Sequence, residues 1–165
     1  MSTRNVLMRY FSSNDWCFSN NNTIAVENGV KFEIVLATNY TEEILKIEVD
    51  DCLFNSLKFR NKKKCDFAFQ RGHDNSFIFV ELKNIPTEDG IAQLDSTISE
   101  FIKAFEEFGE SGDTTNINET SVAFFVYFRA TTMSLSTLTN AKAKFCRKYK
   151  IPLYVEESPY TMFLT

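Results

Sequence analysis

The central element of the fold is indicated by the segment Phe77–Lys83, which reads Phe-Ile-Phe-Val-Glu-Leu-Lys. Its aromatic and β-branched residues predict a buried strand. Side chains alternate along a strand, so Glu81 and Lys83 share one face, about 6.6 Å apart along it. Charged groups are almost never fully buried unless they are paired or bind a metal. These two charges therefore indicate either an ion pair at the rim of a sheet or a binding site.

Strand patterns continue upstream of this segment. Cys65–Phe69 is a second short apolar run, and a turn around Gly72 joins it to Phe77–Lys83, which together predict an antiparallel hairpin. Residues Ile44–Phe54 predict a strand or a strand pair, which could bend at two consecutive aspartates. Val30–Leu36 alternates like a strand. The rest of the first forty residues carries no clear pattern.

Two helices and two further strands are predicted downstream. Thr87 caps the first helix, in which apolar residues from 91 to 108 recur at intervals of three and four and form one stripe. The apolar run Val122–Phe128 predicts a strand covered on both faces. Leu135–Tyr149 predicts a second helix and Leu153–Val155 a last strand. The order β, β, β, α, β, α, β predicts an α/β fold with a mixed central sheet flanked by helices.

Length and composition set further limits. With 165 residues and 44% hydrophobic content, the chain suits a single domain, with residues 1–42 as a poorly defined N-terminal extension and residues 43–155 as the core. The formal charge of -4 would repel nucleic acid, so a polyanion would need a local basic patch. No apolar stretch approaches the ~20 residues that span a bilayer, and no signal-peptide pattern follows Met1. We therefore expect a cytoplasmic protein that does not contact membranes.

The cysteines are expected to be reduced. Cys17, Cys52, Cys65 and Cys146 are scattered, show no C-x-x-C spacing and have only His73 as an imidazole partner, which argues against a zinc site. Three of the four lie in apolar surroundings, so the sequence predicts buried thiols that act as small hydrophobic residues. His73 lies in a turn signal, where a solvated side chain is expected.

The residues Asp66, Glu81 and Lys83 suit metal-assisted hydrolysis of a phosphodiester. Mg²⁺ prefers oxygen ligands and binds one or two carboxylates while it keeps several waters. Asp66 and Glu81 would supply carboxylates from neighbouring strands, helped by the carbonyl oxygen of Leu82. Lys83 could orient the attacking water or stabilise charge on the phosphate. A simple cross-strand ion pair at the sheet rim, with Asp66 in solvent, is the alternative for these residues.

A resemblance to a known family covers roughly Ile44 to Val155. The segments Lys64–Phe69 and Phe79–Lys83, followed by a helix that carries Gln93, resemble the PD-(D/E)xK nuclease superfamily, which has the restriction-endonuclease-like fold. In that family, an acid on the second core strand and an acid and a lysine on the third form the active centre. The resemblance therefore implies Asp66, Glu81 and Lys83 as catalytic residues, with Asp66 and Glu81 as metal ligands.

The same resemblance implies further features of the site. Gln93 would be a supporting residue, because a glutamine on this helix is often part of the site in one branch of the family. The cofactor would be Mg²⁺, with Mn²⁺ as a substitute, and the substrate DNA, although RNA is possible. The sequence also departs from the family pattern. Cys65 replaces the proline before the first acid, and Thr97 stands where a tyrosine is common. The family's additional N-terminal acid could be Glu27, Glu33, Glu43 or Glu48.

Two groups of basic residues could hold a phosphate backbone. The first group precedes Asp66 and the second lies on the predicted helix Leu135–Tyr149. The first contains Arg60, Lys62, Lys63 and Lys64, and the second contains Lys144, Arg147 and Lys148. A solvated loop and a polar helix face explain each group equally well when it is taken alone.

The sequence thus predicts a Mg²⁺-dependent DNA nuclease, either an endonuclease or an exonuclease. Its small size suggests a homodimer, in which two sites could cut both strands. One alternative is an inactive member of the same fold that binds nucleic acid or protein. Another is a small interaction or immunity-type protein, in which some of the 17 phenylalanines form an exposed surface for a partner protein.

Overall fold

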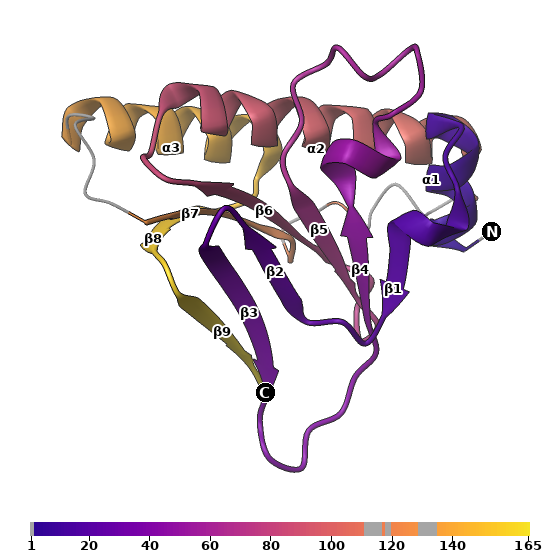
Figure 1. Cartoon of the computed structure of the whole chain (residues 1–165), viewed down its shortest axis with the longest axis horizontal. Helices are drawn as coiled ribbons and strands as arrows, with labels where there is room; N and C mark the ends of the chain where they lie inside the picture. Colours follow the sequence, from indigo (N-terminus) through magenta and orange to yellow (C-terminus); the bar gives the residue numbers. More distant parts are fainter. Residues whose placement is uncertain (1, 111–116, 118–119, 129–134) are drawn as a thin grey trace.

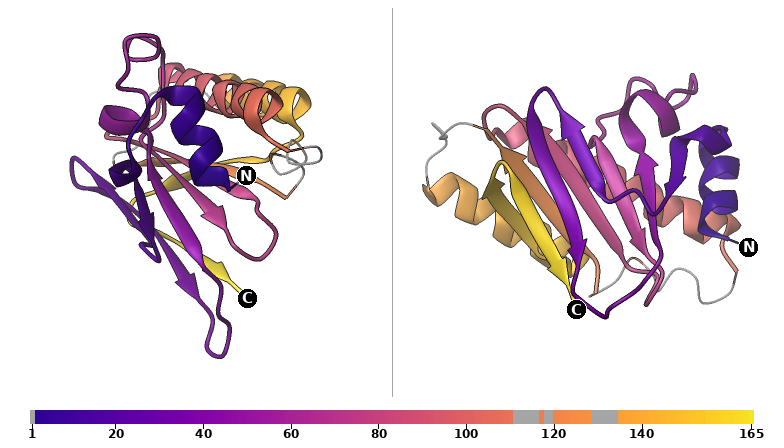
Figure 2. Two further views of the ribbon diagram at one scale, coloured as in Figure 1. Left: turned by 90° about the vertical axis from the view of Figure 1, so that its right-hand side faces the viewer. Right: turned by 60° about the horizontal axis from the view of Figure 1, so that its bottom comes forward.

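Two β-sheets lie face to face in the computed structural model, and helices cover the other face of the larger sheet (Figure 1). The structure describes residues 2–110, 117, 120–128 and 135–165. Figure 2 shows the layers from two further directions, with the smaller sheet and the helices on opposite sides of the larger sheet. The central segments Phe67–Gln70 and Phe77–Leu82 of the larger sheet are therefore shielded from both sides.

The helices are α1 (Thr3–Phe11), α2 (Glu88–Phe108) and α3 (Leu135–Tyr149), with a 3₁₀ turn η1 (Asp15–Cys17) and a wide π-type turn η2 (Val49–Leu53). The larger sheet contains β1 (Phe18–Asn20), β4 (Ile44–Glu48), β5 (Phe67–Arg71), β6 (Phe77–Lys83), β7 (Val122–Tyr127) and β8 (Leu153–Glu157). The smaller sheet contains β2 (Ile24–Glu27), β3 (Val30–Leu36) and β9 (Tyr160–Leu164).

The larger sheet is mixed, in the order β1-β4-β5-β6-β7-β8. Strands β4, β5 and β6 pair antiparallel, whereas β7 is parallel to both β6 and β8. The predicted α/β class and the mixed sheet are confirmed. Helices cover one face of it, and the other face carries the second sheet, which the sequence did not predict.

Most predicted elements of the core are confirmed, and several elements near the chain ends were missed. Strand β6 and helix α3 have the predicted bounds, and residues 44–54 form a single strand followed by η2. The bend at Asp50 and Asp51 is confirmed, with Asp51 at a positive φ of 58°. Helix α1 and strands β1, β2 and β9 were not predicted, because short segments with mixed polar and apolar residues show little periodicity.

Strand β6 is buried on both faces, and its alternation sorts its side chains into two cores. Phe77 and Phe79 join the cluster under the helices, where both rings contact Phe101 of α2. Ile78 and Val80 join the cluster shared with the smaller sheet. Because Glu81 and Lys83 follow the alternation of Phe77 and Phe79, they lie on the side of the helices.

A glycine lets the first turn of α2 rest on the sheet. A Cβ atom at Gly90 would overlap the ring of Phe125 on β7, so only glycine allows this approach. Thr87 caps the helix by accepting a hydrogen bond from the Gly90 amide at 3.4 Å. About two turns further on, Thr97 Oγ1 accepts a hydrogen bond from the Cys65 amide at 2.8 Å and donates one to the Gln93 carbonyl at 2.9 Å. Helix α2 is thereby fixed to the start of β5.

The prediction of reduced cysteines is wrong for Cys17 and Cys52, which form a disulfide across 35 residues of sequence. The antiparallel pairing of β1 with β4 brings η1 and η2 together, and this long-range pairing has no local sequence signal. Cys65 is a buried free thiol as expected, whereas Cys146 is free but exposed. Disulfides are rare in the cytosol, so this bond does not support the predicted cytoplasmic location, which stays a prediction. No helix in the described part of the chain is long and apolar enough to cross a bilayer.

We expect loss of the Cys17–Cys52 bond to lower the free energy of unfolding by about 2–4 kcal/mol, because the unfolded chain gains conformational freedom. Urea denaturation of the double variant Cys17→Ser/Cys52→Ser, compared with the wild type, measures this loss. The matched control is Cys146→Ser, which removes an exposed free thiol and should unfold like the wild type. Equal midpoints for the double variant and the wild type would show that the bond contributes nothing to stability.

Candidate carboxylate site at the end of β6

The structure brings Asp66, Glu81 and Lys83 together at one end of the larger sheet. The register of β5 and β6 pairs Phe67 with Val80, so Asp66, just before β5, lies opposite Glu81. Asp66 Oδ2 accepts a hydrogen bond from the Leu82 amide at 2.7 Å. Lys83 Nζ lies 3.2 Å from Glu81 Oε1. Two carboxylates and an ammonium group therefore share one location.

Burial differs sharply between the members of the site. Glu81 is 0% exposed, whereas the side chain of Lys83 is 34% exposed. The Lys83 ammonium faces Glu81 Oε1, and among the described residues no donor reaches Glu81 Oε2. Gln93 Oε1, on the neighbouring helix, is also buried without a donor. Buried oxygens without donors are costly, and a bound cation or proton would relieve that cost.

The electrostatics of the pair favour protonation when no cation is present. Burial, followed by the charge of Asp66, raises the pKa of Glu81 to about 9, although Lys83 acts against this shift. Burial also raises the pKa of Asp66 to about 6, and the Leu82 amide limits that rise. For Lys83, burial lowers the pKa, but the negative charges of Glu81 and Asp66 outweigh it and leave the pKa raised.

Asp50 is a further acid at this site, and sequence reasoning missed it. Its charge contributes to the raised pKa of both Asp66 and Glu81, and Lys64 Nζ lies 3.8 Å from Asp50 Oδ1. Among the four glutamates considered as the additional acid, Glu27 acts on the pKa of Asp66. The sequence signal for Asp50 was its position just after β4, the strand that pairs with β5.

The site offers two carboxylates to a metal ion, Asp66 and Glu81. In the parts of the chain that the structure describes, no group of three or more His, Cys, Asp and Glu side chains is arranged to hold a metal. Asp66 and Glu81 remain as a pair, and among the described residues Glu81 Oε2 has no hydrogen-bond donor. Mg²⁺ binds one or two carboxylates and keeps several waters, so this pair suits Mg²⁺ better than a metal that needs a closed protein cage.

Most of the basic residues proposed for phosphate binding already have acidic partners. Lys62 pairs with the buried Glu100 at 2.6 Å, Lys63 with Asp89 at 2.6 Å, and Lys148 with Asp95 at 2.9 Å. Lys64 donates to the Arg60 carbonyl at 2.7 Å. The described residues provide no ion pair for the side chains of Arg60, Lys144 and Arg147. The structure therefore does not bring the two basic groups together as one free patch.

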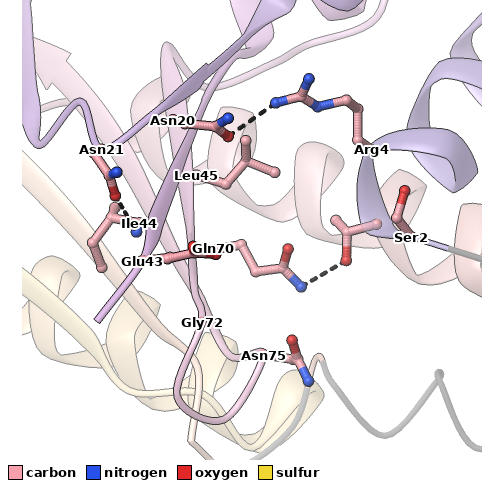
Figure 3. Close-up of a pocket in the computed structure, with 11 residues that line it drawn as sticks. Ser2, Arg4, Asn20, Asn21, Glu43, Ile44, Leu45, Gln70, Gly72 and Asn75 are labelled. Carbon is pink, nitrogen blue, oxygen red and sulfur yellow. Dashed lines mark hydrogen bonds between the residues drawn. The ribbon is translucent and has the colours of Figure 1, made fainter. Parts of the chain in front are cut away.

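A separate polar pocket lies at the opposite end of β5 (Figure 3). It has a volume of about 580 Å³ and is lined by the start of α1 and the ends of β1, β4 and β5. Arg4 Nη2 donates to Asn20 Oδ1 at 3.0 Å, and Gln70 Nε2 donates to Thr3 Oγ1 at 2.6 Å. Because Gln70 and Asp66 lie at opposite ends of β5, this pocket is not part of the carboxylate site.

Comparisons of this chain with known proteins found no matching protein family, no similar curated protein and no similar solved structure. The resemblance to the nuclease superfamily therefore depends on the residues and geometry of this chain alone.

We expect Glu81→Gln to stabilise the protein increasingly as the pH rises. In the folded chain the pKa of Glu81 is about 9, above its ordinary value of 4.5. Between these two pH values the unfolded chain ionises Glu81 and the folded chain keeps it protonated, so the free energy of unfolding falls as the pH rises. Glutamine cannot ionise and removes this loss. The variant should therefore unfold almost like the wild type at pH 5 and be about 2–4 kcal/mol more stable at pH 8.

Urea denaturation across this pH range measures the difference. The control is Glu43→Gln, which removes an exposed carboxylate before the opposite end of β4 and should follow the wild type. A stability difference between Glu81→Gln and the wild type that is the same at every pH would contradict the assigned electrostatics.

Proposed function

We propose that this chain is a metal-dependent nuclease of the PD-(D/E)xK type, with Asp66, Glu81 and Lys83 as its active centre. The observation that carries the proposal is the carboxylate of Glu81, which is fully buried and whose Oε2 has no hydrogen-bond donor among the described residues. A stabilising structural ion pair would satisfy its buried oxygens. A group left in this state opposite a second carboxylate fits a cation-binding role.

The order of elements supports the same proposal. Strands β4, β5 and β6 form an antiparallel series, α2 follows, and β7 then returns parallel to β6. Asp66 stands at the start of the second strand of this series, and Glu81 and Lys83 stand on the third. Gln93 lies on the helix that follows. This order of elements and residues supports the proposed active centre.

The residues of the chain would divide the chemistry between them. Asp66 and Glu81 would hold Mg²⁺, which, when bound, polarises the phosphate and lowers the pKa of an attacking water. The Leu82 amide fixes one oxygen of Asp66. Lys83 is protonated and reaches solvent, so it can contact a phosphate oxygen or hold the water in place. Burial of the carboxylates limits competition from bulk water.

The proposed substrate is DNA, with RNA as the second candidate, and the proposed homodimer would place two sites in one assembly. A second function, an inactive binding module of the same fold, is favoured by one observation. The described residues supply only two carboxylates at the centre, together with the nearby Asp50, and no metal-binding group of three. Metal binding and cleavage must therefore be measured separately.

We expect Mg²⁺ or Mn²⁺ to raise the melting temperature of the wild type, because a ligand that binds only the folded state stabilises it by about 2.7 kcal/mol at 100 times its Kd. Asp66→Asn and Glu81→Gln should abolish the shift, whereas Glu43→Gln should keep it. Affinity should increase with pH, since the carboxylates, with pKa values of about 6 and about 9, must lose protons to bind the metal. Thermal denaturation with and without each cation measures these effects.

We also expect divalent-dependent cleavage of nucleic acid by the wild type. Asp66→Asn, Glu81→Gln and Lys83→Met should each lower the rate by about 10²-fold or more, because they remove metal ligands or transition-state charge stabilisation. A gel assay with single-stranded, duplex and branched DNA and with RNA measures this, and Lys31→Met on β3 is the control. Metal binding without cleavage of any substrate would favour the inactive module. If Glu81→Gln cleaved like the wild type, the nuclease proposal would be wrong.

A further inference from the structure

A small pocket adjoins the carboxylate site at the end of β6. It has a volume of about 350 Å³ and is lined by Asn28, Gly29, Asn84, Ile85 and Phe128. The Phe128 amide donates a hydrogen bond to the Lys83 carbonyl at 3.2 Å, and Asn84 and Ile85 directly follow Lys83 in the chain. The pocket therefore lies directly after the end of β6, one residue beyond Lys83 in the chain.

The turn between β2 and β3 forms the opposite wall of this pocket. Glu27 pairs with Val30, so Asn28 and Gly29 make a two-residue hairpin loop, in which both have positive φ values of 50° and 81°. This tight turn fixes the position of Asn28. Glu27, just before it, lies close enough for its charge to act on Asp66. The wall of the pocket is thus a tight two-residue turn.

The lining combines exposed apolar surface with amide groups and carries no charge. Phe128 is 53% exposed and Ile85 is 42% exposed, so both present large apolar surfaces to solvent. Asn28 and Asn84 are exposed and offer amide donors and acceptors. A polar edge beside an aromatic face is the combination that binds a nucleobase, since the ring stacks on the base and the amides bond to its edge.

We propose that this pocket binds one unpaired base next to the phosphate that is cut, so that the substrate class is single-stranded or frayed nucleic acid. The inference rests on the proposed nuclease function and specifies its substrate. In an intact duplex the faces of each base are stacked on its neighbours and its pairing edge is occupied. The pocket can accept a base only after that base has left the helix. Its uncharged lining adds no repulsion to the phosphate backbone.

The test is binding of a fluorescently labelled single-stranded oligothymidine, compared with a duplex of the same length, by anisotropy without divalent cations. Wild-type protein should bind the single strand at least about tenfold more tightly than the duplex. Phe128→Ala should weaken single-strand binding by about tenfold, because base stacking is lost, and leave duplex binding unchanged. Phe128→Tyr should restore single-strand binding, because it keeps the aromatic ring.

Phe163→Ala is the matched control. Phe163 is an aromatic residue of β9 that is 69% exposed and belongs to the smaller sheet, so its loss should not change binding of either ligand. Tighter binding of the duplex, binding of neither ligand, or equal effects of Phe128→Ala on both ligands would overturn the inference. Because the assay contains no metal, failure of cleavage alone would overturn the nuclease function and leave the base pocket standing.

Discussion

Burial of β6 on both faces is the constraint on which the rest of the structure depends. The strand hydrogen-bonds to β5 and β7, packs Phe77 and Phe79 under the helices, and packs Ile78 and Val80 against the smaller sheet. No part of such a strand meets water until its end. Glu81 and Lys83 are two residues apart on the same face of β6, and the strand reaches solvent between them. Glu81 is therefore buried, whereas the ammonium group of Lys83 lies at the surface.

At this position the ionised carboxylates of Asp66 and Glu81 lower the stability of the folded state unless a proton or a cation accompanies them. Ionising two acids at the edge of an apolar core costs free energy, because burial and mutual repulsion both disfavour the second charge. The pair therefore keeps a proton, binds a cation or lowers the stability of the folded state. Lys83 does not remove the problem, because it faces only Glu81 Oε1 and no other described residue donates to Oε2. The buried carboxylate of Glu100 differs, because it accepts hydrogen bonds from Tyr10 and Lys62. Natural proteins commonly keep such destabilising arrangements where a function requires them.

The sequence predicted those parts of the fold that depend on local periodicity and on hairpin register. The alternation of residues 77–83 and the stripe of α2 define long elements, and the hairpin of β5 and β6 places Asp66 opposite Glu81. Asp50 was missed because it reaches the site through η2, an irregular turn with no periodicity. The Cys17–Cys52 bond and the pairing of Lys62 with buried Glu100 were missed because they join segments far apart in the chain. Such contacts are products of the completed fold.

The distribution of charge explains why a base pocket would matter to this protein. The chain carries a formal charge of -4, and Lys62 and Lys63 are bound to Glu100 and Asp89 rather than displayed for a phosphate backbone. Attraction through many phosphate contacts is therefore a poor source of affinity here. A strand that is held through a stacked base at Phe128 and through one phosphate at the metal needs few free cations. The same small set of contacts would select unpaired nucleic acid, because only an unpaired base has a face to offer.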